Sequence, residues 1–164
     1  MEYILKTNKG DITIKLFTEE APITTKNFMD YADSGFFNGT IFHRVIKNFM
    51  IQGGGFDTDF NEKETAEPIK NEADNGISNK KGTVAMARTM VIDSATAQFF
   101  INTSNNSFLD HTAPTTQGYG YCVFAEVTDG MDVVNEISKT KTTSKEGHDD
   151  VPKETIEIIE VIKK

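Results

Sequence analysis

The chain has 164 residues, enough for one domain with a sizeable buried core and too few for two domains of ordinary size. Its 25 acidic and 17 basic residues give a formal net charge of -8, which argues against binding to nucleic acid. No run approaches the roughly 18 consecutive apolar residues that a membrane helix needs. The lone Cys122 excludes an internal disulfide, and the start of the chain, with Glu2 and Lys6, lacks the pattern of a signal peptide. These features predict a soluble protein of the reducing cytoplasm, and a monomer is the default expectation.

Short apolar runs separated by turn residues dominate the chain and predict strands. The first two runs, 3–7 and 12–17, flank turn residues and predict an opening hairpin. A helix follows, because apolar residues recur at helical spacing behind Pro22, and it is expected to end by Gly35. Five further apolar runs predict strands: 41–46, 49–52, 83–87, 98–102 and 121–127.

The last third of the chain predicts a second helix and a closing strand. Apolar residues recur every three positions within 130–139, which favours the helix. The apolar residues of 156–162 fit both periods imperfectly, and their β-branched content favours a strand. The irregular stretches 57–79 and 105–120 are expected to be surface loops, which commonly carry binding surfaces. Many short strands without a repeat or linker predict a mainly β barrel or sandwich, with residues 1–164 as a single domain.

The common patterns of metal sites and nucleophilic enzymes are weak in this sequence. No metal site and no cofactor are predicted, because the candidate ligands lack ligand spacing: His43, His111, His148 and Cys122. The adjacent Asp110 and His111 suggest a Ser-His-Asp triad, but no serine lies in a nucleophile-elbow pattern. The glycine run 53–55 lacks the lysine of a phosphate-binding loop and indicates a turn or bulge.

The most informative segment, 42–56, places an arginine and a glutamine among apolar side chains. In a strand, alternate residues share a face, so Arg44 points away from His43. His43 is expected to be a core histidine whose ring nitrogens bond to backbone groups. An arginine in a strand is more often a solvated surface residue, and nearby aromatic residues are more often core than pocket. Of the adjacent Phe99 and Phe100, one must face the core and the other can face elsewhere.

Five motifs, in this order, resemble the cyclophilin family of peptidyl-prolyl cis-trans isomerases: FHRVI, FMIQGG, GTVAMAR, SATAQFFIN and FLD. The similarity runs from the first hairpin to the last strand, and YGYCVFAEVTDGMDVV resembles the short bacterial cytoplasmic branch. The resemblance implies a closed eight-stranded antiparallel β-barrel capped by two α-helices, with a groove for proline-containing segments. It also implies non-covalent isomerisation of X-Pro bonds in peptides and folding proteins. The alternatives are a proline-peptide-binding chaperone or adaptor with little turnover, and a scaffold that binds a fixed partner through 105–120.

The resemblance also implies the site residues. Arg44 is the expected catalytic arginine, and Gln52 is expected to orient it. The residues expected to bind the peptide or wall the proline pocket are Phe49, Met50, Ala87, Arg88, Gln98, Phe100, Phe108, Leu109 and Tyr121. Phe108 stands where many eukaryotic members have a tryptophan, and the chain has none, which implies only weak binding of cyclosporin-type inhibitors. Tyr121 stands where many members have a pocket histidine, whereas His111 precedes a loop insertion.

Overall fold

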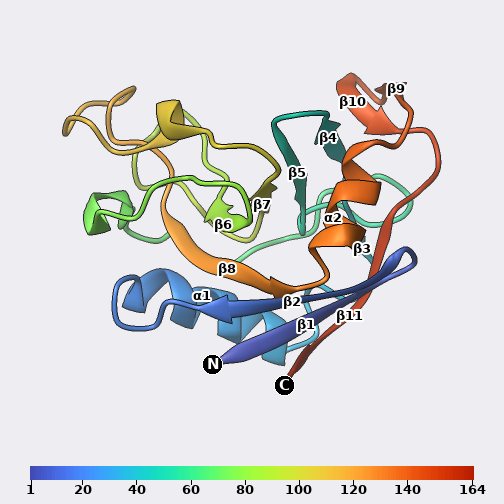
Figure 1. Ribbon diagram of the computed structural model, residues 1–164, viewed down its shortest axis with the longest axis horizontal. Helices are drawn as coiled ribbons and strands as arrows, with labels where there is room; N and C mark the ends of the chain where they lie inside the picture. The colour runs from blue at the N-terminus through green and yellow to red at the C-terminus, as the bar shows by residue number, and fades with distance from the viewer.

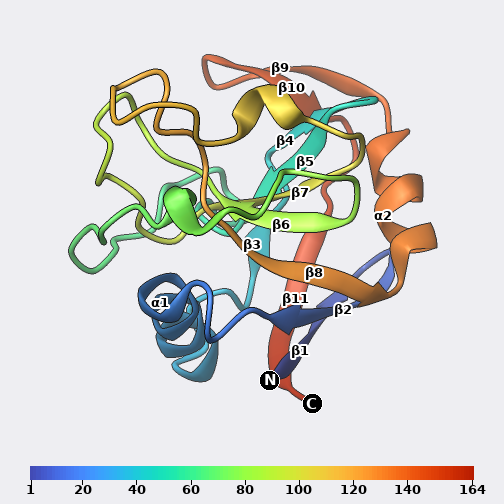
Figure 2. The same cartoon turned by 60° about the vertical axis from the view of Figure 1, so that its left-hand side comes forward.

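The computed structural model describes residues 1–164 as a strongly curled antiparallel sheet of nine strands with two α-helices (Figure 1). The strands lie in the order β3-β11-β1-β2-β8-β6-β7-β5-β4. Their bounds are β1 Glu2–Thr7, β2 Gly10–Leu16, β3 Thr40–Ile41, β4 Arg44–Ile46, β5 Met50–Gly53, β6 Thr83–Met86, β7 Phe99–Asn102, β8 Val123–Asp129 and β11 Glu157–Lys163. The helices are α1 Pro22–Asp33 and α2 Met131–Ser138, which lie at opposite ends of the curled sheet (Figure 2). Neither helix has the length and apolar character needed to cross a lipid bilayer.

The eight strands expected from the sequence are present, but one of them is divided. The predicted strand 41–46 is interrupted at 42–43, and its two halves, β3 and β4, lie at opposite ends of the sheet order. The chain itself therefore links the two edges, and the Ile41 N–H donates to the Phe56 carbonyl at 2.9 Å. The absence of a side chain at Gly53 lets β5 pass close to the backbone of Ile41, because a Cβ at Gly53 would lie 2.6 Å from the Ile41 carbonyl oxygen. The closed eight-stranded barrel of the sequence analysis is in detail a curled nine-stranded sheet.

Both predicted helices, the opening hairpin and the closing strand are confirmed. Pro22 is the first residue of α1, where the missing N–H of a proline leaves no intrahelical bond unmade. The closing strand β11 pairs with β1 along its length, so the two ends of the chain lie side by side (Figure 1). A further hairpin, β9 Thr142–Lys145 with β10 His148–Pro152, forms a separate two-stranded sheet. Its first strand is entirely polar, so it lacks the apolar alternation that indicates strands.

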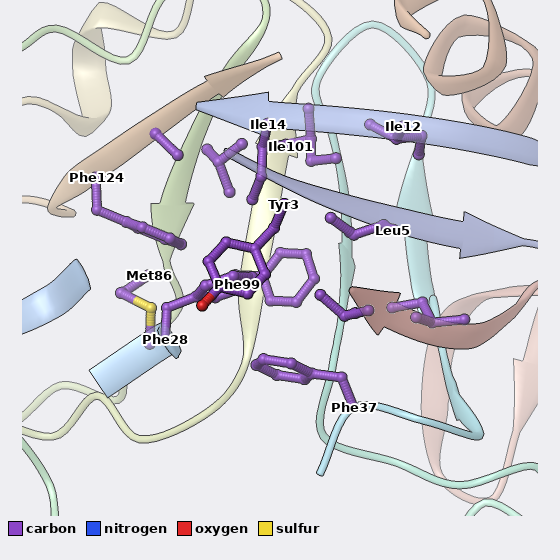
Figure 3. Packing of buried hydrophobic residues seen from close by; sticks show 14 of the residues in the cluster. Tyr3, Leu5, Ile12, Ile14, Phe28, Phe37, Met86, Phe99, Ile101 and Phe124 are labelled. Atoms are coloured by element: carbon purple, nitrogen blue, oxygen red, sulfur yellow. The ribbon is translucent and has the colours of Figure 1, made fainter. Parts of the chain in front are cut away.

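The main core lies between the curled sheet and the two helices, and aromatic rings fill much of it (Figure 3). Phe28 of α1 is at its centre, with ring centroids 5.1 to 5.9 Å from those of Tyr3, Phe37, Phe99 and Phe124. Tilted and edge-on pairs of this kind each stabilise a fold by about 0.5 to 1.5 kcal/mol beyond the area they bury. Because Phe99 is fully buried here, the next residue of β7 points to the opposite face of the sheet.

Candidate active site

The pairing of β4, β5 and β7 brings the predicted site residues onto one face of the sheet. Arg44 of β4 lies opposite Gln52 of β5, and Gln52 lies opposite Phe100 of β7. Met50 shares the face of Gln52, because the two residues are two positions apart in a strand. The three strands therefore present a guanidinium, an amide and two apolar side chains side by side, on the face away from Phe99 and the main core.

These side chains belong to a pocket of about 210 Å³. A small buried cluster, separate from the main core, lies beneath it: Met50, Ala85, Phe100 and Val123. The residues that line the pocket are Arg44, Phe49, Met50, Gln52, Ala87, Arg88, Phe100, Leu109 and Tyr121. All the predicted site residues therefore line this pocket except Gln98 and Phe108. The pocket is lined mainly by apolar side chains, with the Arg44 guanidinium and the Gln52 amide at its edge.

A chain of hydrogen bonds orients the guanidinium. Arg44 Nη1 donates to Gln52 Oε1 at 3.2 Å, and Gln52 Nε2 donates to Gln98 Oε1 at 3.0 Å. Gln98 thus lies behind Gln52 rather than in this pocket, and Gln52 links it to Arg44. None of the four ion pairs of the structure includes Arg44. Its other guanidinium donors have no partner in the chain and face solvent, so they are open to a ligand.

Aromatic rings form the far wall of the pocket. Tyr121 meets Phe100 edge-on, with ring centroids 5.8 Å apart, and the Arg88 guanidinium lies 5.2 Å from the centre of the Tyr121 ring. At the other side, Phe49 stacks on Phe108 with centroids 5.7 Å apart, and Phe108 is 73% exposed. Phe108 therefore extends the apolar surface beyond the rim instead of closing the pocket.

The backbone at Ala87 and Arg88 offers one free donor. The Ala87 N–H already donates to the Gln98 carbonyl at 3.0 Å, whereas the Arg88 N–H makes no hydrogen bond within the chain. Of the two backbone N–H groups at this edge, only that of Arg88 is available to a peptide. The Arg88 side chain is fixed separately, because its Nη2 donates to the Thr116 carbonyl at 2.6 Å.

A second pocket, of about 270 Å³, adjoins the first. Gln52, Ala87 and Arg88 line both, so the two pockets form one continuous groove. The rest of the second pocket is almost entirely polar and is lined by Gly55, Glu62, Lys63, Thr65, Thr89, Ser94, Thr96 and Gln98. Sequence reasoning missed this half of the groove, because its residues come from two loops that only the folded chain brings together.

Sequence reasoning also missed a buried amide network that supports the first pocket. Asn106 Nδ2 donates to the Phe49 carbonyl at 2.8 Å and to Asn102 Oδ1 at 2.8 Å. Asn102 in turn donates to Asn79 Oδ1 at 3.0 Å. Fully satisfied networks of this kind fix the position of the segments that they join. They hold Phe49 and the loop that carries Leu109 against the sheet. The only signal in the sequence is the density of asparagines in 102–106.

The expectation for His43 is partly wrong. The residue is buried, at 4% exposure, and it lies in the link between β3 and β4, against the ring of Phe56. Its Nδ1, however, has no hydrogen-bond partner, so the predicted bonds to backbone groups are absent. Desolvation by burial, followed by the charges of His148 and Arg44, lowers the pKa of His43 from 6.5 to about 4. The ring is therefore neutral at neutral pH.

The remaining candidate groups lie apart from the groove. Nδ1 of His111 lies 2.9 Å from the Tyr119 carbonyl oxygen, and this histidine does not line the first pocket. Cys122 is buried, and desolvation raises its thiol pKa to about 11. No group of three or more His, Cys, Asp or Glu side chains is arranged to hold a metal ion.

Comparison with known proteins agrees with this geometry. The sequence profile of the family described as "Cyclophilin type peptidyl-prolyl cis-trans isomerase/CLD" matches residues 3–163. Peptidyl-prolyl cis-trans isomerase B of Escherichia coli is 59% identical over 156 residues, which cover 95% of this chain and 94% of that protein. Peptidyl-prolyl cis-trans isomerase cyp18 of Streptomyces antibioticus is 55% identical over 154 residues, 94% of this chain and 93% of that protein.

A solved structure gives the same result for the fold. The crystal structure of a Cryptosporidium parvum cyclophilin-type peptidyl-prolyl cis-trans isomerase, in the presence of the dipeptide Ala-Pro, matches with a TM-score of 0.80 and 25% identity. The match covers 99% of this chain and 98% of that one. The chain belongs to the cyclophilin-type peptidyl-prolyl cis-trans isomerases, enzymes that catalyse rotation about X-Pro peptide bonds.

Proposed function

We propose that the apolar pocket binds the proline ring of an X-Pro segment and that Arg44 assists rotation about the bond before it. The barrier to this rotation is about 18 to 20 kcal/mol, because amide resonance gives the C–N bond partial double-bond character. Rotation localises the nitrogen lone pair on the proline. A guanidinium N–H that donates to this lone pair stabilises the twisted transition state more than the planar ground state. The observation that carries the proposal is a guanidinium with free donors at the edge of an apolar pocket.

The other residues of the pocket have supporting roles. Four apolar side chains would hold the proline ring still: Phe49, Met50, Phe100 and Leu109. Gln52 would keep the guanidinium directed at the ring nitrogen, since it is the one side chain bonded to Arg44. The free N–H of Arg88 would donate a hydrogen bond to the carbonyl oxygen of the residue before the proline. No step needs a nucleophile or a proton transfer.

Proline-containing peptides, and unfolded or folding proteins that contain them, are the proposed substrates. The groove itself supports this assignment, because it is open along the surface and continues past the proline pocket into the second pocket. The structural relative from Cryptosporidium parvum, which was crystallised in the presence of Ala-Pro, supports it independently.

The role of Arg44 is tested with Arg44→Ala and Arg44→Lys in an NMR magnetisation-transfer assay on a proline-containing tetrapeptide. Loss of one transition-state donor should lower the exchange rate by on the order of 100-fold. Lysine should restore little, because an ammonium lacks the planar donor geometry of a guanidinium. Lys47→Ala is the matched control, since Lys47 is an exposed cation in the adjoining turn that does not line the pocket.

The same samples separate catalysis from simple binding. Peptide affinity is measured beside the exchange rate, and Arg44→Ala should bind the tetrapeptide nearly as well as the parent protein. Unchanged exchange in Arg44→Ala would show that the arginine has no catalytic role. A parent protein that binds tightly but exchanges the peptide no faster than buffer would instead be the adaptor.

We also infer that the protein acts as a cytoplasmic monomer and binds cyclosporin-type inhibitors weakly. Phe108 supports the second inference, because a phenyl ring lacks the N–H donor that an indole would offer to an inhibitor. A single domain over residues 1–164 is supported by the main core, a cluster of 28 buried residues that draws on both ends of the chain.

A further inference from the structure

The three most exposed large apolar side chains of the protein belong to segments that line the groove or contact residues that do. Met90 and Phe108 are each 73% exposed and Val91 is 66% exposed, whereas the next in order, Ile159, is 52% exposed. Phe108 lies at the proline-pocket end, stacked on Phe49. Met90 and Val91 lie at the other end, in a turn whose first and last residues, Thr89 and Ser94, line the second pocket. Apolar surface thus continues the groove beyond the residues already assigned to it.

The turn that presents Met90 and Val91 is internally fixed. The Thr89 N–H donates to Ser94 Oγ at 2.9 Å, and the Ser94 hydroxyl donates to the Val91 carbonyl at 2.6 Å. The Val91 N–H donates to Thr89 Oγ1 at 3.2 Å. The two apolar side chains are therefore exposed by an ordered turn, not by a segment without structure of its own.

The turn is also tied to the body of the protein. Asn71, which is buried, donates from Nδ2 to the Ile92 carbonyl at 3.2 Å and from its backbone N–H to Asp93 Oδ1 at 2.9 Å. The Ile69 N–H donates to the Ala95 carbonyl at 3.0 Å. A surface that is already ordered loses little conformational entropy when a ligand binds to it. The position of Met90 and Val91 relative to the groove is consequently preset.

We propose that Met90 and Val91 form an additional subsite that binds an apolar side chain of the client, several residues before the proline. The proposal rests on the proposed function, in which the residue before the proline bonds to the Arg88 N–H. A chain that continues from there in the same direction passes through the second pocket and reaches the turn of Thr89 to Ser94. The occupant is an extended, unfolded polypeptide, in which apolar side chains are not yet buried.

The size of the patch favours this occupant over a folded partner. A stable interface between folded proteins needs more than roughly 1,000 Å² of buried surface, and two side chains supply only a fraction of that. One extended chain that already fills the proline pocket needs no such area, because each added contact acts on a segment that is held in place. The subsite therefore extends recognition from the proline to the sequence before it.

The test uses nonapeptides, which span roughly 30 Å when extended. A single leucine is moved through the second to the fifth positions before the proline of an otherwise alanine, serine and glycine sequence. A parallel set has the leucine after the proline. Affinities are measured by NMR titration for the parent protein, for the double variant Met90→Ser/Val91→Ser, and for Ile159→Ser, an exposed apolar residue on β11 that serves as the control.

Leucine at one or more positions before the proline should raise the affinity of the parent protein about tenfold, equivalent to 1.4 kcal/mol. The double variant should lose this gain, and Ile159→Ser should keep it. The proposal is overturned if the double variant keeps the gain in peptide affinity. It is also overturned if affinity rises only for peptides with leucine after the proline. Loss of the gain in Ile159→Ser as well would show a nonspecific effect and overturn it equally.

Two further measurements separate this proposal from its alternatives. Turnover of a tetrapeptide should be unchanged in the double variant, because Met90 and Val91 do not line the proline pocket. Failure of Arg44 to affect turnover would refute the catalytic proposal while leaving the nonapeptide affinities to decide the subsite. Sedimentation should show that the parent protein does not self-associate. Self-association of the parent protein that the double variant abolishes would overturn the subsite, because it would assign Met90 and Val91 to contacts between copies of the chain.

Discussion

His43 should make the stability of this protein depend on pH between about 4 and 6.5. Its ring lies against Phe56, with centroids 4.5 Å apart, is 4% exposed and has an unpaired Nδ1. A charge on such a ring is costly, because burial removes it from bulk solvent, its Nδ1 has no hydrogen-bond acceptor, and His148 and Arg44 lie nearby. The His43 ring is therefore protonated in the folded protein only below about pH 4, whereas in the unfolded chain its pKa is near 6.5.

The sign and the size follow from this difference. Below pH 6.5 the unfolded chain gains a proton that the folded chain does not, so the free energy of unfolding falls as the pH falls. The stabilisation is complete above pH 6.5 and is lost by about pH 4, where both states are protonated. Each pKa unit corresponds to about 1.4 kcal/mol, so a shift of roughly 2.5 units gives about 3 kcal/mol.

The assay is urea unfolding of the parent protein and His43→Phe at several pH values from 7.5 to 4. Other groups titrate in both proteins, so the difference between them isolates His43. The parent protein should lose about 3 kcal/mol more than the variant over this range. Ile159→Ser, which changes no ionisable group, is the control and should follow the parent. Equal losses in His43→Phe and the parent, or an NMR titration of His43 near 6.5, would refute the reasoning.

Two more predictions concern buried positions. Cys122 is 3% exposed, and burial raises its thiol pKa to about 11. A thiol reagent at pH 8 should therefore label Cys122 only when the protein is unfolded in urea. Rapid labelling of the folded protein would contradict this burial. Gly54→Ala should lower the free energy of unfolding by about 2 kcal/mol, since it combines backbone strain with overpacking. The φ angle at Gly54 is +89°, and the added Cβ would lie 2.8 Å from the Phe99 ring. Gly39→Ala is the control for backbone strain alone, because Gly39 has a φ of +80° and open space around it. If urea unfolding shows an equal loss of stability in both variants, the contact with the Phe99 ring does not contribute.

The sequence was sufficient for the elements but not for their pairing. Alternation in 41–46 and 49–52 indicates two strands, and Asn48 between them has a φ of 62°, a conformation that asparagine tolerates better than most residues. The pairing of Arg44 with Gln52 depends on the length of that turn. One residue more or less would have placed Gln52 on the opposite face from Arg44. The sequence pattern alone therefore identifies Arg44 and Gln52 as candidates, whereas their contact depends on the register of β4 and β5.

The contacts that sequence reasoning missed are all long-range. Gln98 supports Gln52 from 46 residues away, and Asn106 holds the backbone of Phe49 from 57 residues away. Local periodicity carries no information about such pairs, because it reports only which face of an element a residue occupies. The unpaired nitrogen of His43 is missed for the same reason, since only the folded chain determines which backbone groups come near it.

The neutral partner of Arg44 bears on the choice between catalysis and binding. A carboxylate in place of Gln52 would hold the guanidinium more firmly, because charge-assisted hydrogen bonds are roughly twice as strong as neutral ones. It would also neutralise the charge that must meet the lone pair of the proline nitrogen. The amide fixes the direction of the guanidinium at 3.2 Å and leaves its charge unpaired. In a groove that only held proline peptides, such a cation would find neutral carbonyl oxygens and no anion to replace the water that binding removes. An oriented and unneutralised arginine is best suited to the negative charge that gathers on the proline nitrogen during rotation, which supports the proposed role of Arg44 in the transition state.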